Sequence, residues 1–326
     1  MRISNKKIKK EKGDRFSLFF MCVIFINMNY ISLTRQIIKE MVDDLEEKKY
    51  GLKYYAFDWD DNLMKMPTQI ILLNEEGDEV GMSTEDFAEY RTDIGKKPFT
   101  YNGETIVGFA DNPFRFFGTQ GDSKFMTDIE DAPLVRGPWR DFVEAINNGS
   151  VFAIITARGH HPNTLKKGVL KLILMGRGGL NKEQLVQSLI EYRRIMGLKP
   201  ITNESWLIRD YLERCRFYPV SYGEGSATNP EEGKVRAMEE FINYVKGMSF
   251  RLQKKEYKFV NDVSNRFVPK MPMVGFSDDD VRNVEVMKKH FEKKPDNILK
   301  TYLTKDDEKT MMEQLVIRTL KKIKSK

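Results

Sequence analysis

KYYAFDWDDNL, at residues 53–63, combines a short apolar run with an abrupt change to acidic residues. Such a run is typical of a strand that is buried within a parallel sheet. Side chains two positions apart on a strand point to the same face, so Asp58 and Asp60 can converge on one ligand. Two carboxylates this close repel each other unless a cation or a shared proton relieves them. The segment therefore predicts a buried strand with polar chemistry at its carboxyl end.

Three more apolar runs follow this strand along the chain. They are SVFAIITAR at 150–158, CRFYPVSY at 215–222 and MPMVGFSDDD at 271–280. Helical spacing between the runs is found at residues 139–146, 163–175, 182–196, 205–214 and 230–245, and again at 281–291. Strands that alternate with helices predict a parallel sheet with right-handed crossovers. We therefore expect an α/β fold with a Rossmann-like parallel sheet flanked by helices, and ligands beyond the carboxyl ends of its strands.

A β-rich insertion is expected after the first core strand. TQIILLNEEGDEVGM, at 68–82, predicts two strands around a Gly-Asp turn, and PFTYNGETIVGF, at 98–109, predicts a hairpin around Asn102 and Gly103. Ser83 and the acids after it predict the start of a short helix between them. Residues 111–138 are expected to form an irregular loop.

These elements divide the chain into three parts. The first part is a basic and apolar extension at 1–31, followed by an α/β core at 32–295 and a charged helical tail at 296–326. Within the core, a helix is predicted at 32–49, and insertions are expected near 64–138 and 176–214.

The positive charge is concentrated at the two ends. The first 15 residues carry seven Lys or Arg against two acids, and residues 318–326 carry five against none. Since the whole chain has a net charge of +6, the intervening residues sum to −4. Nucleic acid is therefore a less favoured partner, because basic ends are more often solvated than bound to phosphate.

The apolar run FSLFFMCVIFI, at 16–26, leaves the location of the protein open. It resembles a signal peptide or a short anchor, although it has about half of the ~20 residues that a spanning helix needs. Membrane contact is expected only through residues 16–31, and a start at Met28 would remove most of this segment. Cys22 and Cys215 form no CxxC pair, which favours a reducing compartment. We expect a cytoplasmic protein, with anchoring or secretion as the alternatives.

Polar residues at the strand ends are the candidate site residues. Asp278 and Asp279 belong to three successive acids after a strand, which are costly without a cation; an acidic N-cap for the next helix is the alternative. The Thr156 hydroxyl can donate to a phosphoryl oxygen or merely end a strand. Lys234 lies near a helix N-terminus, where the dipole disfavours a cation. That placement suggests a role beyond the default of a surface lysine.

Neighbouring residues have more than one interpretation. Arg158 either contacts a substrate phosphate or lies on the surface. His160 and His161 are expected to be structural or exposed rather than ligands. The aromatic and basic residues at 114–117 could stack bases, but covering the site or packing a small core is the expected role.

In this order, the features resemble the haloacid dehalogenase superfamily of phosphohydrolases over roughly residues 50–292. The first motif of that family is a strand followed by DxDx(T/V). Here it reads DWDDN, with Asp58 and Asp60 on the acidic positions and Asn62 where Thr or Val is usual. The second motif is an apolar strand that ends in Ser or Thr, which Thr156 matches.

The last two motifs are matched nearer the C-terminus. Lys234 best matches the Lys that precedes the last core strand in that family. GFSDDDVRN matches an apolar strand that ends in DDxxxN, through Asp278, Asp279 and Asn283. Because Asp280 extends the acidic run, its register is open by one residue, and Asn283 favours Asp278 and Asp279 as the working pair.

The resemblance implies a reaction and a cofactor. Asp58 is expected to attack phosphorus and form an aspartyl-phosphate, and Asp60 to act as acid and then as base. Thr156 and Lys234 are expected to stabilise the phosphoryl oxygens. The expected cofactor is Mg²⁺. Its expected ligands are Asp58, the backbone carbonyl of Asp60, and Asp278 or Asp279.

Three functions are consistent with these residues. The first is a Mg²⁺-dependent phosphatase that acts on a phosphorylated small molecule or a nucleotide, with a polynucleotide end as a variant substrate. The second is a catalytically silent relative that binds phosphate or a partner protein. The third is a phosphotransferase that passes the phosphoryl group to an acceptor other than water.

Overall fold

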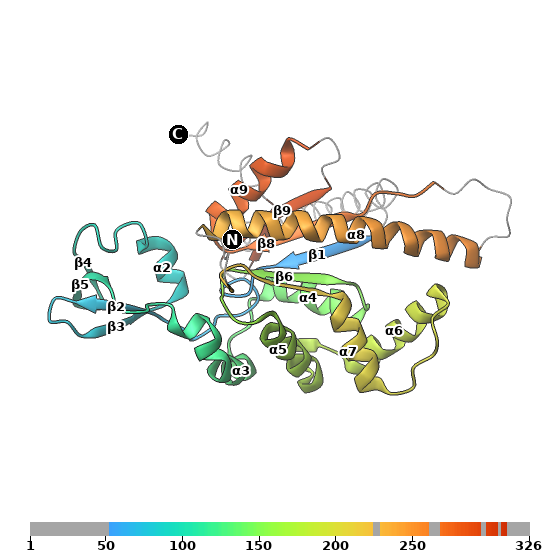
Figure 1. The fold of residues 1–326 in the computed structure, drawn as a ribbon, viewed down its shortest axis with the longest axis horizontal. Coiled ribbons are helices and arrows are strands. Elements are labelled where there is room, and N and C mark those ends of the chain that lie inside the picture. The colour runs from blue at the N-terminus through green and yellow to red at the C-terminus, as the bar shows by residue number, and fades with distance from the viewer. Residues whose placement is uncertain (1–51, 224–228, 261–267, 295–297, 306–307, 312–326) are drawn as a thin grey trace, which may run out of the picture. The chain divides into compact units, whose positions relative to one another are not determined.

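The apolar run at 53–57 forms β1, a central strand of a six-stranded sheet (Figure 1). The computed structural model describes residues 52–223, 229–260, 268–294, 298–305 and 308–311, all within one compact unit, Leu52–Lys326. The expected extension at 1–31 and the helix at 32–49 lie outside these residues.

The sheet strands are β1 (Lys53–Phe57), β6 (Phe152–Thr156), β7 (Arg216–Pro219), β8 (Met273–Asp278), β9 (Leu299–Lys305) and β10 (Glu308–Met311). Their order is β10-β9-β8-β1-β6-β7, and only β10 is antiparallel to its neighbour.

Helices pack on both faces of this sheet and form a hydrophobic core with each face. On one face lie α4 (Arg136–Asn147), α5 (Pro162–Met175), α6 (Lys182–Met196) and α7 (Glu204–Arg214), with the short η3 (Arg177–Gly179) between α5 and α6. On the other face lie α8 (Pro230–Val260) and α9 (Val281–Glu292). The chain is therefore a mixed α/β protein with a mostly parallel sheet flanked by helices, as its alternating pattern predicts.

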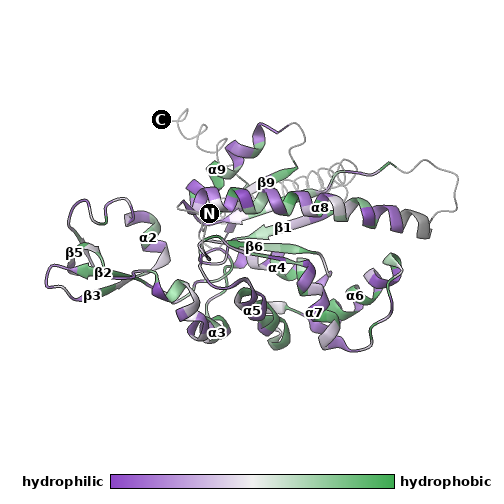
Figure 2. Cartoon of the chain, in the orientation of Figure 1, coloured by the Kyte–Doolittle hydropathy of each residue, from purple (hydrophilic) through white to green (hydrophobic). Residues whose placement is uncertain are grey.

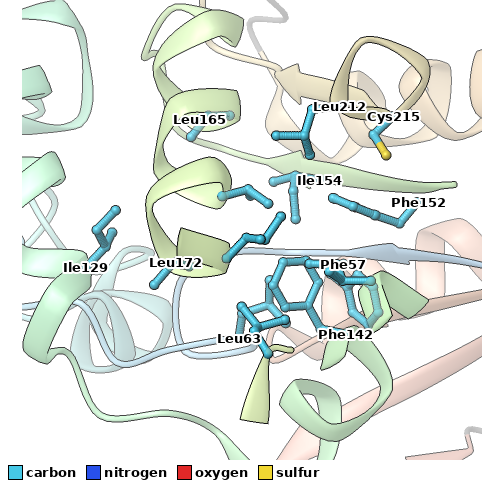
Figure 3. Packing of buried hydrophobic residues seen from close by; sticks show 14 of the residues in the cluster. Phe57, Leu63, Ile129, Phe142, Phe152, Ile154, Leu165, Leu172, Leu212 and Cys215 are labelled. Atoms are coloured by element: carbon cyan, nitrogen blue, oxygen red, sulfur yellow. The ribbon is translucent and has the colours of Figure 1, made fainter. Parts of the chain in front are cut away.

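Because a strand is pleated, alternate side chains of β1 point to opposite faces of the sheet and pack in the two different cores. Phe57 packs with Phe142 of α4, and Phe142 packs with Phe152 of β6, at ring-centroid distances of 5.5 and 5.3 Å (Figure 3). Ala56 belongs to the opposite core, with Phe241 of α8. Hydrophobic and hydrophilic residues alternate along α8, as expected of a helix that covers a sheet with one side (Figure 2).

A second sheet is formed by the chain between β1 and α4. It contains β2 (Ile70–Asn74), β3 (Glu79–Met82), β4 (Phe99–Tyr101) and β5 (Glu104–Phe109), in the antiparallel order β3-β2-β5-β4. Asn102 and Gly103 have φ values of +50° and +88°, which the tight β4–β5 turn requires. Both predicted hairpins are confirmed. The predicted short helix is α2 (Thr84–Tyr90), with the Ser83 hydroxyl as its N-cap.

The prediction of an irregular loop at 111–138 is wrong for most of that segment. It contains η1 (Arg115–Phe117), η2 (Thr119–Gly121), α3 (Asp122–Asp131) and the first turn of α4. Phe125 and Ile129, four positions apart, bury one side of α3. Three apolar residues in ten make a weak periodic signal, and the flanking Gly and Pro residues obscured it.

The prediction of a helical tail at 296–326 is also wrong where the structure describes it. Residues 299–305 and 308–311 are the strands β9 and β10, so the core sheet continues past the expected boundary at 295. Leu299, Thr301 and Thr304 are buried in β9. The charged residues between them suggested a solvated helix, but parallel pairing with β8 selects the strand. Residues 312–326 lie outside the described part of the chain.

None of the helices in the described residues has the length and apolar character needed to cross a membrane. The apolar segment at 16–31 lies outside those residues, as does Cys22. Cys215 is a buried free thiol in the core that contains Phe152.

Candidate functional site

The carboxyl ends of three adjacent strands bring most of the predicted site residues together. Asp58 directly follows β1, Thr156 ends β6 and Asp278 ends β8. From β1 the chain continues to β6 and β7 on one side, then crosses to β8 on the other side of β1. The sheet thus has a switch in strand order beside β1, which is where open α/β sheets bind ligands.

Three carboxylates meet at this switch. Asp58, Asp278 and Asp279 each offer an oxygen, and these oxygens lie within 4.8 Å of one another. Asp58 is only 6% exposed, and its Oδ1 is buried without a hydrogen-bond partner among the described residues. A buried carboxylate oxygen without a donor is costly. The cluster therefore fits a hard divalent cation, for which carboxylate oxygens are the usual ligands.

Among the described residues, Lys234 supplies the positive charge next to these carboxylates. It lies in the first turns of α8 and is 1% exposed. Its Nζ is 2.7 Å from Asp278 Oδ2 and 3.0 Å from Asp58 Oδ2. The ion pairs explain why a cation is found near a helix N-terminus, where the dipole alone would disfavour it. Lys234 is a buried partner of the acids rather than a surface lysine.

The acidic run after β8 divides into two parts. Asp278 Oδ1 accepts hydrogen bonds from Asn283 Nδ2, at 2.9 Å, and from the backbone N–H of Asp280, at 3.0 Å. The Asp280 side chain instead caps α9 by accepting from the Arg282 N–H. The N-cap interpretation therefore applies to Asp280 alone, and Asp278 and Asp279 are the pair that faces Asp58.

The electrostatics of the cluster favour a bound cation. Burial raises the pKa of Asp58 to about 7, against the opposing effect of Lys234, and the charge of Asp278 raises it further. Burial and then Asp278 also raise the pKa of Asp279 well above its ordinary value. Burial alone would lower the pKa of Lys234, but Asp278 and Asp58 outweigh it and raise that pKa. One lysine is thus insufficient to neutralise three carboxylates, so either a bound proton or a divalent ion would complete the balance.

Asp60 is held by an arginine. Arg158 donates from Nε to Asp60 Oδ2 at 2.7 Å and from Nη2 to Asp60 Oδ1 at 2.6 Å, a bidentate arrangement. Arg158 is 1% exposed, and its Nη2 also donates to Thr68 Oγ1 at 2.9 Å. The surface interpretation of Arg158 is therefore wrong. Its nitrogens have partners within the protein, and contact with a substrate phosphate stays a prediction.

A buried histidine supports this arginine. His160 is fully buried, and its Nε2 lies 3.1 Å from Arg158 Nη1 while its Nδ1 lies 2.7 Å from Asp122 Oδ1. Burial and the adjacent Arg158 lower the pKa of His160, which favours the neutral ring. Because Arg158 can only donate, Nε2 is the acceptor and Nδ1–H donates to Asp122. The interpretation of His160 as structural is supported by this network, whereas its link to Asp60 through Arg158 had no signal in the sequence.

Thr156 is 1% exposed, and its hydroxyl accepts a hydrogen bond from the Arg158 N–H at 3.3 Å. It lines the same cavity as Asp58. The hydroxyl hydrogen is not used in this contact, so it remains available to an oxygen of a bound ligand.

Asn62, the departure from the usual first motif, connects β1 to the C-terminal strands. Its Nδ2 donates to the Asp58 carbonyl and to Ser277 Oγ, both at 3.1 Å, and its Oδ1 accepts from Thr304 Oγ1 at 2.6 Å. Asn62 and Thr304 are both buried. Sequence reasoning missed Thr304, because its partner lies 242 positions away.

Thr304→Val is expected to lower the free energy of unfolding by about 1–3 kcal/mol. The substitution keeps the side-chain shape but leaves the buried Asn62 Oδ1 without a donor. Urea denaturation would measure the difference. Thr310→Val, on the half-buried edge strand β10, is the matched control and should change stability by no more than about 0.5 kcal/mol. Equal effects of the two substitutions would contradict this role of Thr304.

A cavity of about 370 Å³ has two of the three acids, Asp58 and Asp279, in its lining. Thr156 and Lys234 line it as well. Its remaining lining includes Ile70, Thr84, Phe87, Arg91, Phe114, Phe117 and Ser221. This volume lies at the lower end of the range of small-molecule sites. The cluster is therefore accessible to a small ligand.

Comparison with known proteins gave no significant match to a family model, to a curated protein or to a solved structure.

Proposed function

We propose that the chain is a Mg²⁺-dependent phosphomonoester hydrolase with a haloacid dehalogenase-like core and a β-rich insertion, and that Asp58 is its nucleophile. The observation that carries the proposal is the buried Asp58 carboxylate next to Asp278 and Asp279. One of its oxygens is bound by Lys234, and the other has no hydrogen-bond partner in the part of the chain that the structure describes. A structural acid in a core would be fully hydrogen-bonded. The cytoplasmic location expected from the sequence is part of this proposal.

The proposed reaction has two steps. A carboxylate oxygen of Asp58 attacks phosphorus, the bond from phosphorus to the leaving oxygen breaks, and that oxygen takes a proton from Asp60. Water then attacks the aspartyl-phosphate, Asp60 takes the proton of the water, and Asp58 is released with inorganic phosphate. The Arg158 fork and the His160–Asp122 pair behind it fix the orientation of Asp60 for both proton transfers.

Lys234 and Thr156 are proposed to stabilise the phosphoryl oxygens, since both line the cavity beside Asp58. The residues that would hold Mg²⁺ are Asp58 and the pair Asp278 and Asp279, with the backbone carbonyl of Asp60 as the further expected ligand. When bound, Mg²⁺ would neutralise the acids and polarise a phosphoryl oxygen.

The test is release of inorganic phosphate from a panel of phosphomonoesters, with Mg²⁺ and with EDTA. The expected result is Mg²⁺-dependent release. Adding an alcohol as acceptor separates hydrolysis from phosphotransfer, because a transferase would form a new phosphate ester. Binding of phosphate without release or transfer from any member would overturn the proposal in favour of a silent relative.

The proposed metal site also predicts a dependence of stability on pH. The pKa of Asp58 is raised to about 7 from an ordinary 3.8, so between these values the metal-free folded protein retains a proton that the unfolded chain has lost. Metal-free stability should therefore fall as pH rises from about 4 to about 7. Because the ligands must be deprotonated to bind metal, Mg²⁺ should raise the Tm more at about pH 8 than at about pH 6. Thermal unfolding with Mg²⁺ and with EDTA measures both effects, and an equal Mg²⁺ effect at the two pH values would contradict them.

A further inference from the structure

Part of the cavity lining is aromatic. Phe87 comes from α2, while Phe114 and Phe117 come from the segment that follows β5, and all three line the cavity. Their rings are in contact, with centroids 5.6 Å apart for Phe87 and Phe114 and 6.1 Å apart for Phe114 and Phe117. We name these three residues the aromatic wall.

Core packing accounts for part of this wall, but not for Phe114. Phe117 is 9% exposed and belongs to the small core of the second sheet, and Phe87 packs against that core. Phe114, in contrast, remains 43% exposed although it also contacts Phe109. An exposed aromatic ring on a cavity wall offers a flat apolar surface to a ligand.

The charges of the cavity limit what else a ligand can carry. Its described lining contains five acids and three bases, a sum of −2 that one divalent cation would cancel. Each base is paired: Arg158 with Asp60, Lys234 with the acids of the cluster, and Arg91 with Glu231 at 2.6 Å. No unpaired cation among these lining residues is available to a second phosphate.

We propose that the substrate is a small phosphomonoester with a single phosphate and a planar aromatic group. The aromatic group stacks on the aromatic wall, and the phosphate binds beside Asp58 and Lys234. This inference rests on the proposed function and names the substrate class of the same site. A nucleobase and a simple aryl ring share the required chemistry.

The experiment uses substrate pairs with the same type of leaving group. Adenosine and cytidine 5′-monophosphates are compared with ribose 5-phosphate, and 2-phenylethyl phosphate is compared with 2-cyclohexylethyl phosphate. Stacking on an aromatic side chain predicts that the planar member of each pair has a kcat/KM about tenfold higher. A preference in the nucleoside pairs alone would identify the nucleobase as the source, and a preference in both would identify any planar ring.

Phe114→Leu keeps an apolar side chain but removes the ring face. It should therefore bring the ratio of the two kcat/KM values within each substrate pair close to one. Phe116→Leu is the matched control, since Phe116 is a similarly exposed neighbour that does not line the cavity, and it should retain the wild-type ratio. Equal kcat/KM values in the wild type, or a ratio unchanged by Phe114→Leu, would overturn the inference. Preference for a nucleoside diphosphate or a phosphorylated oligonucleotide would also overturn it.

Ligand binding separates this inference from the proposed function. Calorimetric titration of the non-hydrolysable phosphonate analogues of the same ligands into the full-length protein with Mg²⁺ reports recognition without turnover. Tighter binding of the planar ligands, abolished by Phe114→Leu, would support the aromatic wall even if no phosphate is released. Equal binding of planar and non-planar ligands would contradict it, whatever the activity.

Discussion

Asp58→Asn is expected to reduce kcat by roughly 10⁴-fold or more, because an amide cannot take the place of the carboxylate that we propose as the nucleophile. The amide has the same shape, so the fold should be preserved. Removing a buried acid whose pKa is raised to about 7 should also leave the Tm of the metal-free protein at pH 8 equal to or above that of the wild type. The variant thus separates activity from stability. Phosphate release and thermal unfolding in EDTA would measure the two effects.

Asp111→Asn is the control for this substitution, since Asp111 is an exposed acid away from the cluster. It should have the activity and Tm of the wild type. Turnover by Asp58→Asn within tenfold of the wild type would contradict the assignment of the nucleophile. A large fall in its Tm would instead show that Asp58 stabilises the fold, contrary to the electrostatics of the cluster.

Lys234→Met is expected to destabilise the protein by about 3–5 kcal/mol, the largest effect on stability among these substitutions. Methionine fills a similar volume but leaves Asp58 and Asp278 buried without their cation. Activity should be lost as well, because Lys234 lines the cavity beside Asp58, the proposed nucleophile. Urea denaturation in EDTA measures the loss of stability. Mg²⁺ should restore part of it by supplying positive charge to the same acids.

Lys167→Met, on the exposed side of α5, is the matched control and should change stability by no more than about 0.5 kcal/mol. A Lys234→Met variant with the urea midpoint of the wild type would show that the cluster does not depend on the lysine. A midpoint that Mg²⁺ leaves unchanged would argue against a cation site at these acids.

The sequence predicted the elements whose signal is local. The β1, β6 and β8 strands are apolar runs that end in polar residues, and the parallel arrangement follows from the helices between them. The prediction that Lys234 serves the site came from a conflict with the helix dipole, and its two ion pairs resolve that conflict. A residue whose charge opposes the local preference of its helix is expected more often at functional sites than elsewhere.

The parts that the sequence could not predict depend on tertiary contacts. The β9 strand is selected by pairing with β8 and by the hydrogen bond from Thr304 to Asn62, neither of which has a periodic signal. The network from Asp122 through His160 to Arg158 requires α3, which was expected to be a loop. These buried polar groups find their hydrogen-bond partners in residues that lie far away in the sequence.

The covalent intermediate is the most direct test of the central claim. The protein is mixed with a substrate from the panel and Mg²⁺, quenched in acid during turnover, and digested for mass spectrometry. A phosphoryl group on the peptide that carries Asp58, replaced by homoserine at that position after borohydride reduction, is the predicted result. Mg²⁺-dependent phosphate release with no adduct at Asp58, and unchanged release by Asp58→Asn, would contradict it.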